Sequence, residues 1–138
     1  VKNEVAKRGI ALKTEIPDHL GPVKGNGTEL EQVFINLIVN AMDATSRGGE
    51  ISLRAQQLNG TVSVEVRDTG HGISPENLRR IFDPFFTTKD VGVGTGLGLA
   101  ITYRIMEDHG GKIDVASSPG SGTTFTVTFP VIVKATPA

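Results

Sequence analysis

The chain has 138 residues, which is the size of one ordinary domain, and its hydrophobic and charged fractions of 38% and 21% exclude a disordered or fibrous protein. Lysine and arginine number 14 against 15 aspartates and glutamates, so there is no general attraction to nucleic acid or to an anionic membrane. The absence of cysteine excludes disulfides, thiol nucleophiles and cysteine-bound zinc. We therefore expect one soluble domain that contacts neither nucleic acid nor membrane and suits the cytoplasm, although a full-length protein containing it could be membrane-anchored.

The first half of the chain alternates helical and extended patterns. Residues 1–8 have the spacing of the end of a preceding helix or linker, and residues 10–16 predict a short strand, with another extended piece around Val23. Residues 28–46 predict a helix, because apolar side chains recur at i, i+3, i+4 and i+7 and Thr28 with Glu31 forms a capping box. Alternating segments on either side of Asn59-Gly60 predict an antiparallel hairpin.

The second half predicts two further helices and a second hairpin. Ser74-Pro75 starts a short helix, residues 82–97 form a long loop, and a helix beginning near Leu99 ends at Gly110-Gly111. Strands follow around residues 113–115 and 125–129, and residues 132–138 form a tail. This order predicts an α+β two-layer sandwich, with about three helices on one face of a mixed, mainly antiparallel sheet of about five strands, in a domain spanning 9–131.

A polar stripe runs along the helix predicted over 28–46. Asn36, Asn40 and Asp43 follow one another at helical spacing beside the apolar face. The stripe is consistent with an ordinary exposed face. It is also consistent with a Mg²⁺ site, because a carboxamide oxygen beside a carboxylate suits a hard cation that keeps several waters.

Two polar residues fall on the inward face of predicted strands. By the period of two, Asp68 continues the inward series that contains Val62 and Val66, and Thr123 continues that of Phe125. An inward carboxylate is costly unless hydrogen-bond donors meet it. Asp68 thus either caps an Asx turn or contacts a ligand, and the position of its side chain favours the ligand.

Glycines are concentrated where the long loop enters a helix, in GTGLGL at 94–99. Such a loop lets backbone amides approach an anion at the positive end of a helix, although a flexible hinge has the same composition. Neither the Rossmann nor the Walker A spacing fits. Lys89 is the nearest cation in the sequence, and the phenylalanines of IFDPFFTTK at 81–89 are expected to anchor the loop. His19, His71 and His109 lack metal-ligand spacing.

Together and in this order, the segments resemble the ATP-binding catalytic domain of bacterial sensor histidine kinases, over about residues 8–131. The resemblance is carried by an N box, a first glycine box, an F box, a second glycine box and the closing strands: ELEQVFINLIVNAMDA, DTGHGI, IFDPFFTTK, GTGLGLAI, and HGGKI with GTTFTVTFP. It implies the Bergerat-type ATP-binding fold, which is shared with gyrase-type topoisomerases, mismatch-repair proteins and heat-shock chaperones.

The resemblance also implies roles for individual residues. Asn40 would ligate Mg²⁺, Asn36 would lie beside the phosphates, and Asp68 would accept a hydrogen bond from the adenine amino group. Residues from about Asn77 to Thr95 would form a lid over ATP. The other implied nucleotide contacts are Asp43, whose role is open, and Gly70, Gly72, Ile73, Lys89, Gly94, Thr95, Gly96, Leu97, Gly98, Leu99 and Thr123.

Position 36 separates kinase from hydrolase. The related ATPases carry a glutamate there as the base that activates water, whereas this chain has Asn36, which cannot accept the proton. The resemblance thus implies a protein-histidine kinase domain whose phosphoacceptor histidine lies on a separate dimerisation domain of the same protein. A response regulator would act downstream, and this domain in isolation is expected to be monomeric. An anti-sigma-type serine kinase and a nucleotide-binding pseudokinase remain as alternatives.

Overall fold

The structure is a computed structural model, and it describes residues 2–16, 27–58, 60–83 and 98–130. The predicted extended piece at Val23 and the predicted tail at 132–138 lie outside these residues. The elements in chain order are α1 (Lys2–Lys7), β1 (Ala11–Glu15), α2 (Gly27–Ala44), β2 (Glu50–Leu58), β3 (Thr61–Asp68), α3 (Pro75–Leu78), α4 (Gly98–Asp108), β4 (Lys112–Ser117) and β5 (Thr123–Pro130).

The strands form one five-stranded sheet in the order β1-β2-β3-β5-β4. Only β1 and β2 are parallel among these pairs, and the predicted hairpin is present as β2 and β3, in which Ala55 lies opposite Val64. Gly60 adopts a φ of +80° in the connection, a conformation that glycine reaches without steric cost. The mixed, mainly antiparallel sheet predicted from the sequence is confirmed.

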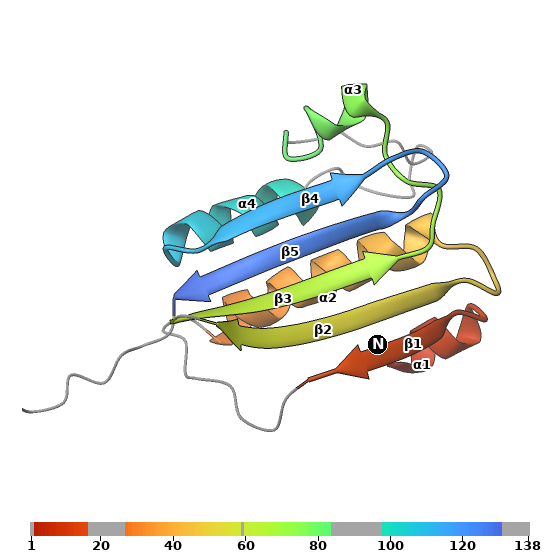
Figure 1. Cartoon of the computed structure of the whole chain (residues 1–138), viewed down its shortest axis with the longest axis horizontal. Coiled ribbons are helices and arrows are strands. Elements are labelled where there is room, and N and C mark those ends of the chain that lie inside the picture. Colours follow the sequence, from red (N-terminus) through yellow and green to blue (C-terminus); the bar gives the residue numbers. More distant parts are fainter. Residues whose placement is uncertain (1, 17–26, 59, 84–97, 131–138) are drawn as a thin grey trace, which may run out of the picture.

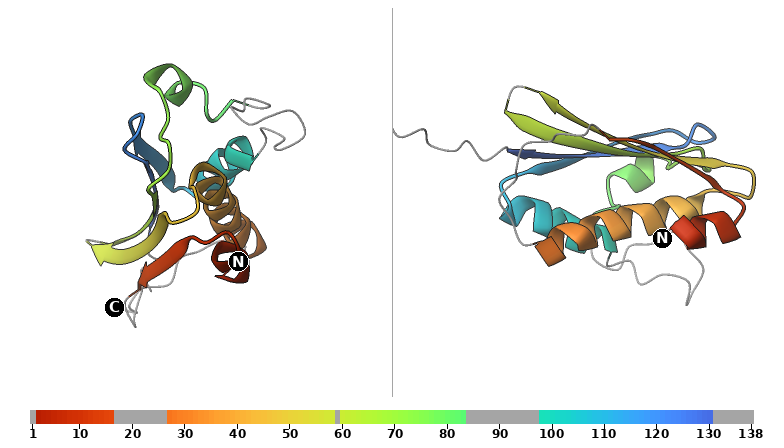
Figure 2. Two further views of the ribbon diagram at one scale, coloured as in Figure 1. Left: turned by 90° about the vertical axis from the view of Figure 1, so that its right-hand side faces the viewer. Right: turned by 90° about the horizontal axis from the view of Figure 1, so that it is seen from below.

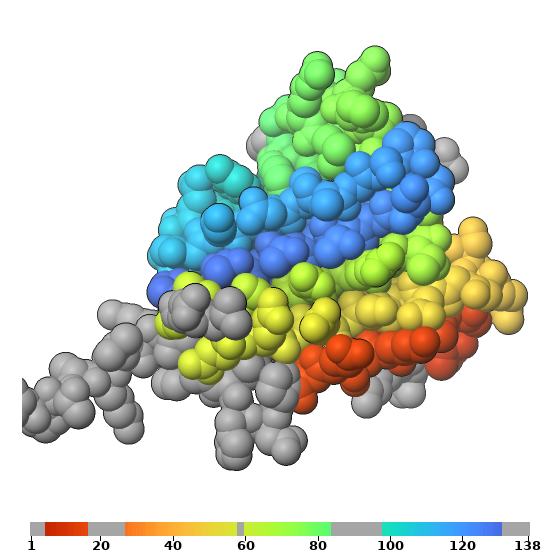
Figure 3. Space-filling view, in the orientation of Figure 1, coloured from red at the N-terminus to blue at the C-terminus, as the bar shows by residue number. Residues whose placement is uncertain are grey.

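The helices α1, α2 and α4 form a second layer on one face of the sheet (Figure 2), while α3 lies beyond the edge formed by β4 (Figure 1). None of the described helices lies on the opposite face of the sheet, and Figure 3 shows the strands side by side on that face. The two-layer α+β sandwich with three helices on one face is therefore confirmed. None of the described helices combines the length and the apolar character needed to cross a membrane.

The core lies between the two layers. It joins inward side chains of the strands, such as Ile51, Val66 and Phe125, to the apolar face of α2, including Leu37. Val5 of α1 is fully buried in the same cluster. The helix at residues 2–7 therefore packs into the domain core, although the sequence predicted the domain to begin at residue 9.

The N-terminal cap predicted from the sequence is correct for α3 and wrong for α2. Ser74 caps α3 as predicted, accepting a hydrogen bond from the Asn77 backbone N–H at 3.3 Å, with Pro75 in the first turn. The longer helix α2 begins at Gly27, one residue before the predicted cap Thr28, which lies inside the first turn instead. The capping-box assignment for Thr28 is therefore wrong.

Candidate functional site

A row of polar side chains crosses the sheet where β3, β5 and β4 meet. Asp68 ends β3 and lies opposite Thr123, the first residue of β5, and Thr123 in turn lies opposite Ser117, the last residue of β4. Asp68 is 2% exposed and Thr123 is 4% exposed, although both face an otherwise apolar layer. The inward placement predicted for both residues is confirmed.

The Asp68 carboxylate is met by backbone donors. Gly70 N–H donates to Asp68 Oδ1 at 2.8 Å, and the backbone N–H of Thr123 also donates to this carboxylate. Burial raises the pKa of Asp68 above its usual value, and the two backbone donors and the nearby His71 oppose that rise. The turn-capping role and a ligand-contacting role are therefore both available to this one side chain.

Glycines next to Asp68 are required by close backbone approaches. A Cβ on Gly70 would lie 2.2 Å from the carbonyl oxygen of Ala44, at the end of α2. Gly72 has a φ of +75°, and its Cβ would lie 2.0 Å from the Ser118 carbonyl oxygen. The Gly122 Cβ would lie 2.1 Å from the Asp68 carbonyl oxygen. Side chains at these positions would push apart the strand ends that hold Asp68.

Ser117 connects the members of this group, and the sequence analysis did not single it out. Its hydroxyl accepts from Ile73 N–H at 2.8 Å, donates to Gly122 O at 2.9 Å and lies 2.8 Å from the Thr123 hydroxyl. The signal was present, because Ser117 continues the inward series of Ile113 and Val115 by the same period of two that located Asp68.

A second group of polar side chains joins the helices α2 and α4. The Asn36 side-chain NH₂ donates to the Gly98 carbonyl oxygen at 3.1 Å and to the Thr102 hydroxyl at 3.2 Å. Gln32 Nε2 donates to Asn36 Oδ1 at 2.7 Å. The Asn36 side chain is half-buried and tied to α4, so the interpretation of this stripe as an ordinary exposed face does not hold at Asn36.

Asn40 and Asp43 continue the stripe along α2. Asn40 is half-buried, one turn beyond Asn36. The Asp43 carboxylate accepts from the Arg8 guanidinium, with Arg8 Nη1 2.9 Å from Asp43 Oδ1. Asp43 thus connects α2 to the residue that follows α1.

The remaining predicted site residues divide by position. Ile73 and Leu99 are half-buried and pack against the core cluster. Phe82 packs on Tyr103 of α4, with ring centroids 5.3 Å apart, which agrees with the anchoring role predicted for the F-box segment. The predicted contacts that lie outside the described residues are Lys89, Gly94, Thr95, Gly96 and Leu97.

Both described histidines bind backbone carbonyls locally. His71 Nδ1 lies 2.8 Å from Gly72 O, and His109 Nδ1 lies 2.8 Å from Ile105 O. Within residues 2–16, 27–58, 60–83 and 98–130 there is no group of three or more His, Cys, Asp or Glu side chains that could hold a metal by themselves.

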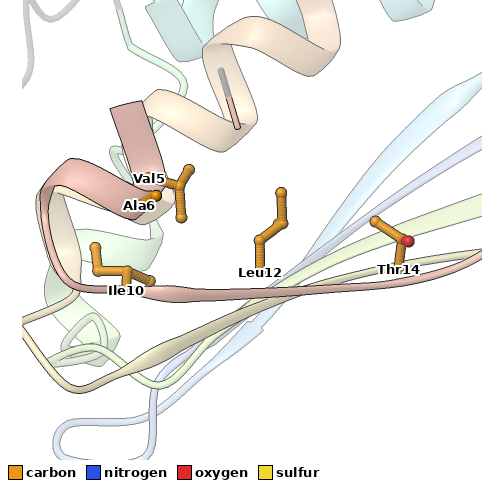
Figure 4. Close-up of a pocket in the computed structure, with 5 residues that line it drawn as sticks. All are labelled: Val5, Ala6, Ile10, Leu12 and Thr14. Carbon is orange, nitrogen blue, oxygen red and sulfur yellow. The ribbon is translucent and has the colours of Figure 1, made fainter. Parts of the chain in front are cut away.

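A groove of about 250 Å³ lies under the edge strand β1 (Figure 4). Val5, Ala6, Ile10, Leu12 and Thr14 line it. Four of these five side chains are apolar and none is ionisable, so the groove differs in chemistry from the polar site around Asp68.

The two polar groups are connected through α2. His71 N–H donates to the carbonyl oxygen of Ala44 at 3.2 Å, which holds the loop after Asp68 against the end of the helix that carries Asn36 and Asn40. Ala44 lies eight residues after Asn36 on this helix, a rise of about 12 Å. A buried acceptor at one end and carboxamides beside a helix start at the other are groups of the kind that bind an elongated polar ligand of the nucleotide class.

Comparison with known proteins agrees with this class. Residues 25–132 match the family described as histidine kinase-, DNA gyrase B- and HSP90-like ATPase, and the chain belongs to this family of ATP-binding domains. The sensor histidine kinase ZraS of Escherichia coli (strain K12) is 42% identical over 131 residues, which cover 95% of this chain and 28% of ZraS.

Solved structures show the same fold. The catalytic domain of histidine kinase ThkA superimposes with a TM-score of 0.83 at 36% identity, covering 94% of this chain and 84% of that one. Full-length ShkA in complex with AMPPNP gives a TM-score of 0.83 at 31% identity, covering 99% of this chain and 28% of that one. ThkA has also been solved with the response regulator TrrA, with a TM-score of 0.79 at 32% identity, covering 95% and 37%. The chain therefore has the fold of a histidine kinase catalytic domain and spans less than a third of ZraS.

Proposed function

We propose that this domain binds Mg-ATP and transfers its γ-phosphoryl group to a histidine on a separate dimerisation domain of the same full-length protein, from which a response regulator receives it. The family membership supports ATP binding, and the structures of ThkA with a response regulator and of ShkA with AMPPNP support the partner and the nucleotide. The site residues supply the chemical argument.

The adenine end of the site is assigned to the strand ends. Asp68 would accept a hydrogen bond from the adenine amino group, because an ionised carboxylate has four acceptor positions and backbone amides occupy only part of them. Gly70 and Thr123 contact this carboxylate, and together with Gly72 and Ile73 they would form the walls of the base pocket. Their tight backbone packing would keep the pocket in shape before the nucleotide arrives.

The phosphate end is assigned to α2 and the start of α4. Asn36 and Gly98 would lie beside the phosphates, followed by Leu99, with Lys89, Gly94, Thr95, Gly96 and Leu97 predicted to complete the contacts. A Cβ at position 98 would fit without a clash, because its nearest neighbour would be Asn36 Cγ at 3.8 Å, an ordinary contact distance. The packing of the fold therefore does not require glycine at this position. The glycine is therefore available for close approach of a ligand.

Asn40 fits Mg²⁺ as a single protein ligand. Its carboxamide oxygen is a hard donor, and Mg²⁺ commonly takes one or two protein oxygens and completes its shell with phosphates and water. When bound, the ion would neutralise charge on the transferring phosphoryl group. Asp43 is paired with Arg8, and we assign it to holding α2 against the end of α1 beside the site.

The chemistry of the Asn36 side chain favours phosphoryl transfer over hydrolysis of ATP. Its NH₂ donates to Gly98 and Thr102, and its amide has no basic group that could take a proton from water. In the proposed transfer the bond between the γ-phosphorus and the β–γ bridging oxygen breaks, a bond from phosphorus to an imidazole nitrogen forms, ADP leaves, and the imidazole releases its proton to water. The acceptor imidazole must come from another domain.

The test uses γ-³²P-labelled ATP with this chain, alone and with the histidine-bearing helical hairpin of its full-length protein. We expect ATP binding, slow phosphate release and no self-labelling, with label appearing on the hairpin as an acid-labile phosphohistidine. A hairpin with its acceptor histidine changed to glutamine is the matched control and should stay unlabelled.

Other results would overturn the proposal. Rapid phosphate release by the chain alone would show an ATPase. Acid-stable label on a serine of an added protein would show a serine kinase of the anti-sigma type, and ATP binding without transfer to the hairpin would show a pseudokinase. Light scattering of the isolated chain tests the proposed monomer.

A further inference from the structure

The side chain of Thr102 is an unusual feature of α4. It is fully buried at 0% exposure, yet it falls within the apolar stripe that α4 turns to the core, between Leu99 and the buried pair Ile105 and Met106. A buried hydroxyl needs partners, since an unpaired one costs free energy. An apolar residue would suit a position that served packing alone.

The hydrogen-bond partners of the Thr102 hydroxyl lie on both α4 and α2. Thr102 Oγ1 donates to the Gly98 carbonyl oxygen of its own helix at 2.8 Å and accepts from Asn36 Nδ2 of α2 at 3.2 Å, while Asn36 Nδ2 lies 3.1 Å from the same Gly98 oxygen. These three groups form a closed triangle that joins two helices. Because the Gly98 carbonyl can only accept, the triangle requires that the NH₂ of Asn36 face α4.

Gln32 acts on the other end of the same amide. Its NH₂ donates to Asn36 Oδ1 at 2.7 Å, one turn earlier on α2. The Asn36 amide is therefore held from both ends, and its rotamer is set by groups on both helices. Gly98 is the first residue of α4, so the triangle also ties the start of that helix to α2.

We infer that Thr102 is a positioning residue for the phosphate end of the site: its hydroxyl orients the Asn36 carboxamide and holds the start of α4 beside it. This inference rests on the proposed assignment of Asn36 and Gly98 to the phosphates. Thr102 is fully buried behind Asn36 and Gly98 and would not itself contact the nucleotide. Its contribution should therefore appear for ligands that carry a phosphate chain and be absent for adenosine.

The test is Thr102→Val, which keeps the shape of the side chain and removes the hydroxyl. Calorimetric titration should show Mg-ATP affinity reduced roughly three- to tenfold, the range for losing one neutral hydrogen bond, with adenosine affinity unchanged. Thr102→Ser, which retains the hydroxyl, should restore ATP affinity. In an Asn36→Ala background, Thr102→Val should have no further effect on ATP, because the group it positions is gone.

Thr45→Val is the matched control. Thr45 directly follows α2 and is also a buried threonine, and its hydroxyl donates to the carbonyl oxygen four residues earlier, that of Ala41 at 2.7 Å. It should leave both affinities unchanged, and thermal unfolding should show that both valine variants fold.

The outcomes separate the possible failures. Equal loss of ATP and adenosine affinity in Thr102→Val, or unchanged ATP affinity, would overturn the positioning role. If the unmodified chain binds neither ATP nor adenosine, the proposed function itself fails.

Discussion

The two ends of the site are built in different ways. Around Asp68 the backbone makes the site: amide donors meet the carboxylate, and Gly70, Gly72 and Gly122 are needed because carbonyl oxygens approach within about 2 Å of where a Cβ would stand. Around Asn36 side chains make the site, through hydrogen bonds between α2 and α4. Changes at the first end should therefore disturb folding together with binding, with Asp68 itself the exception. Changes at the second end should weaken binding without destabilising the fold.

The largest expected effect is on folding, at the Asp68 end. Gly72→Ala combines a positive φ with a Cβ placed 2.0 Å from the Ser118 carbonyl oxygen. We expect the free energy of unfolding to fall by about 3 kcal/mol or more, measured by urea titration. Gly120→Ala is the control, because Gly120 has a φ of +80° but open space around its Cβ, and it should lose only about 1–2 kcal/mol. Equal losses would show that the close approach to Ser118 does not matter.

Asp68→Asn should separate binding from folding at the same end. The amide oxygen can keep the Gly70 N–H, which leaves the NH₂ as a donor where the adenine amino group needs an acceptor. Loss of a charge-assisted hydrogen bond is worth roughly 1.5–3 kcal/mol, so ATP affinity should fall about 10- to 150-fold by calorimetry. The exposed carboxylate control Asp114→Asn should bind ATP normally. A folded Asp68→Asn variant with full affinity would contradict the assignment.

Gly98→Ala should weaken ATP binding without lowering stability, whereas Gly72→Ala should mainly lower stability. Nothing packs closely on this position, and alanine is the better helix former, so stability should be unchanged or raised by up to about 1 kcal/mol. ATP affinity should fall about fivefold, equivalent to one backbone contact of about 1 kcal/mol. Gly27→Ala, at the first residue of α2 with open space around it, is the matched control and should leave ATP affinity unchanged. Unchanged affinity in Gly98→Ala would remove Gly98 from the phosphate contacts.

The smallest expected effect is the pH dependence of stability. The pKa of Asp68 is raised above its usual value of 3.8 in the folded chain. Between pH 3.8 and the folded-state pKa, Asp68 is therefore ionised in the unfolded chain and protonated in the folded chain. The contribution of Asp68 to the free energy of unfolding must therefore fall as pH rises through this window and stay constant above it. In urea titrations at a series of pH values, the free energy of unfolding of Asp68→Asn should rise relative to that of the unmodified chain as the pH increases through the same window. A difference curve that is flat or has the opposite slope would show that Asp68 is not desolvated.

Local patterns were sufficient wherever neighbouring residues decide the outcome. The period of two placed Asp68 and Thr123 on the inner face, and the periodic apolar stripe located α2, because both depend on backbone geometry within one element. The observed start of α2 at Gly27 differs by one residue from the predicted start, a difference within the one or two residues by which helix ends commonly vary.

The sequence by itself determined the strands, the main helices, the family resemblance and the candidate residues, because periodicity and spacing are properties of contiguous segments. The tertiary structure decided which polar groups share hydrogen bonds: Ser117 with Ile73 and Thr123, and Asn36 with Gly98 and Thr102. It also placed Val5 in the core and paired Arg8 with Asp43. Each of these contacts joins separate elements, and their geometry exists only once the helices pack on the sheet.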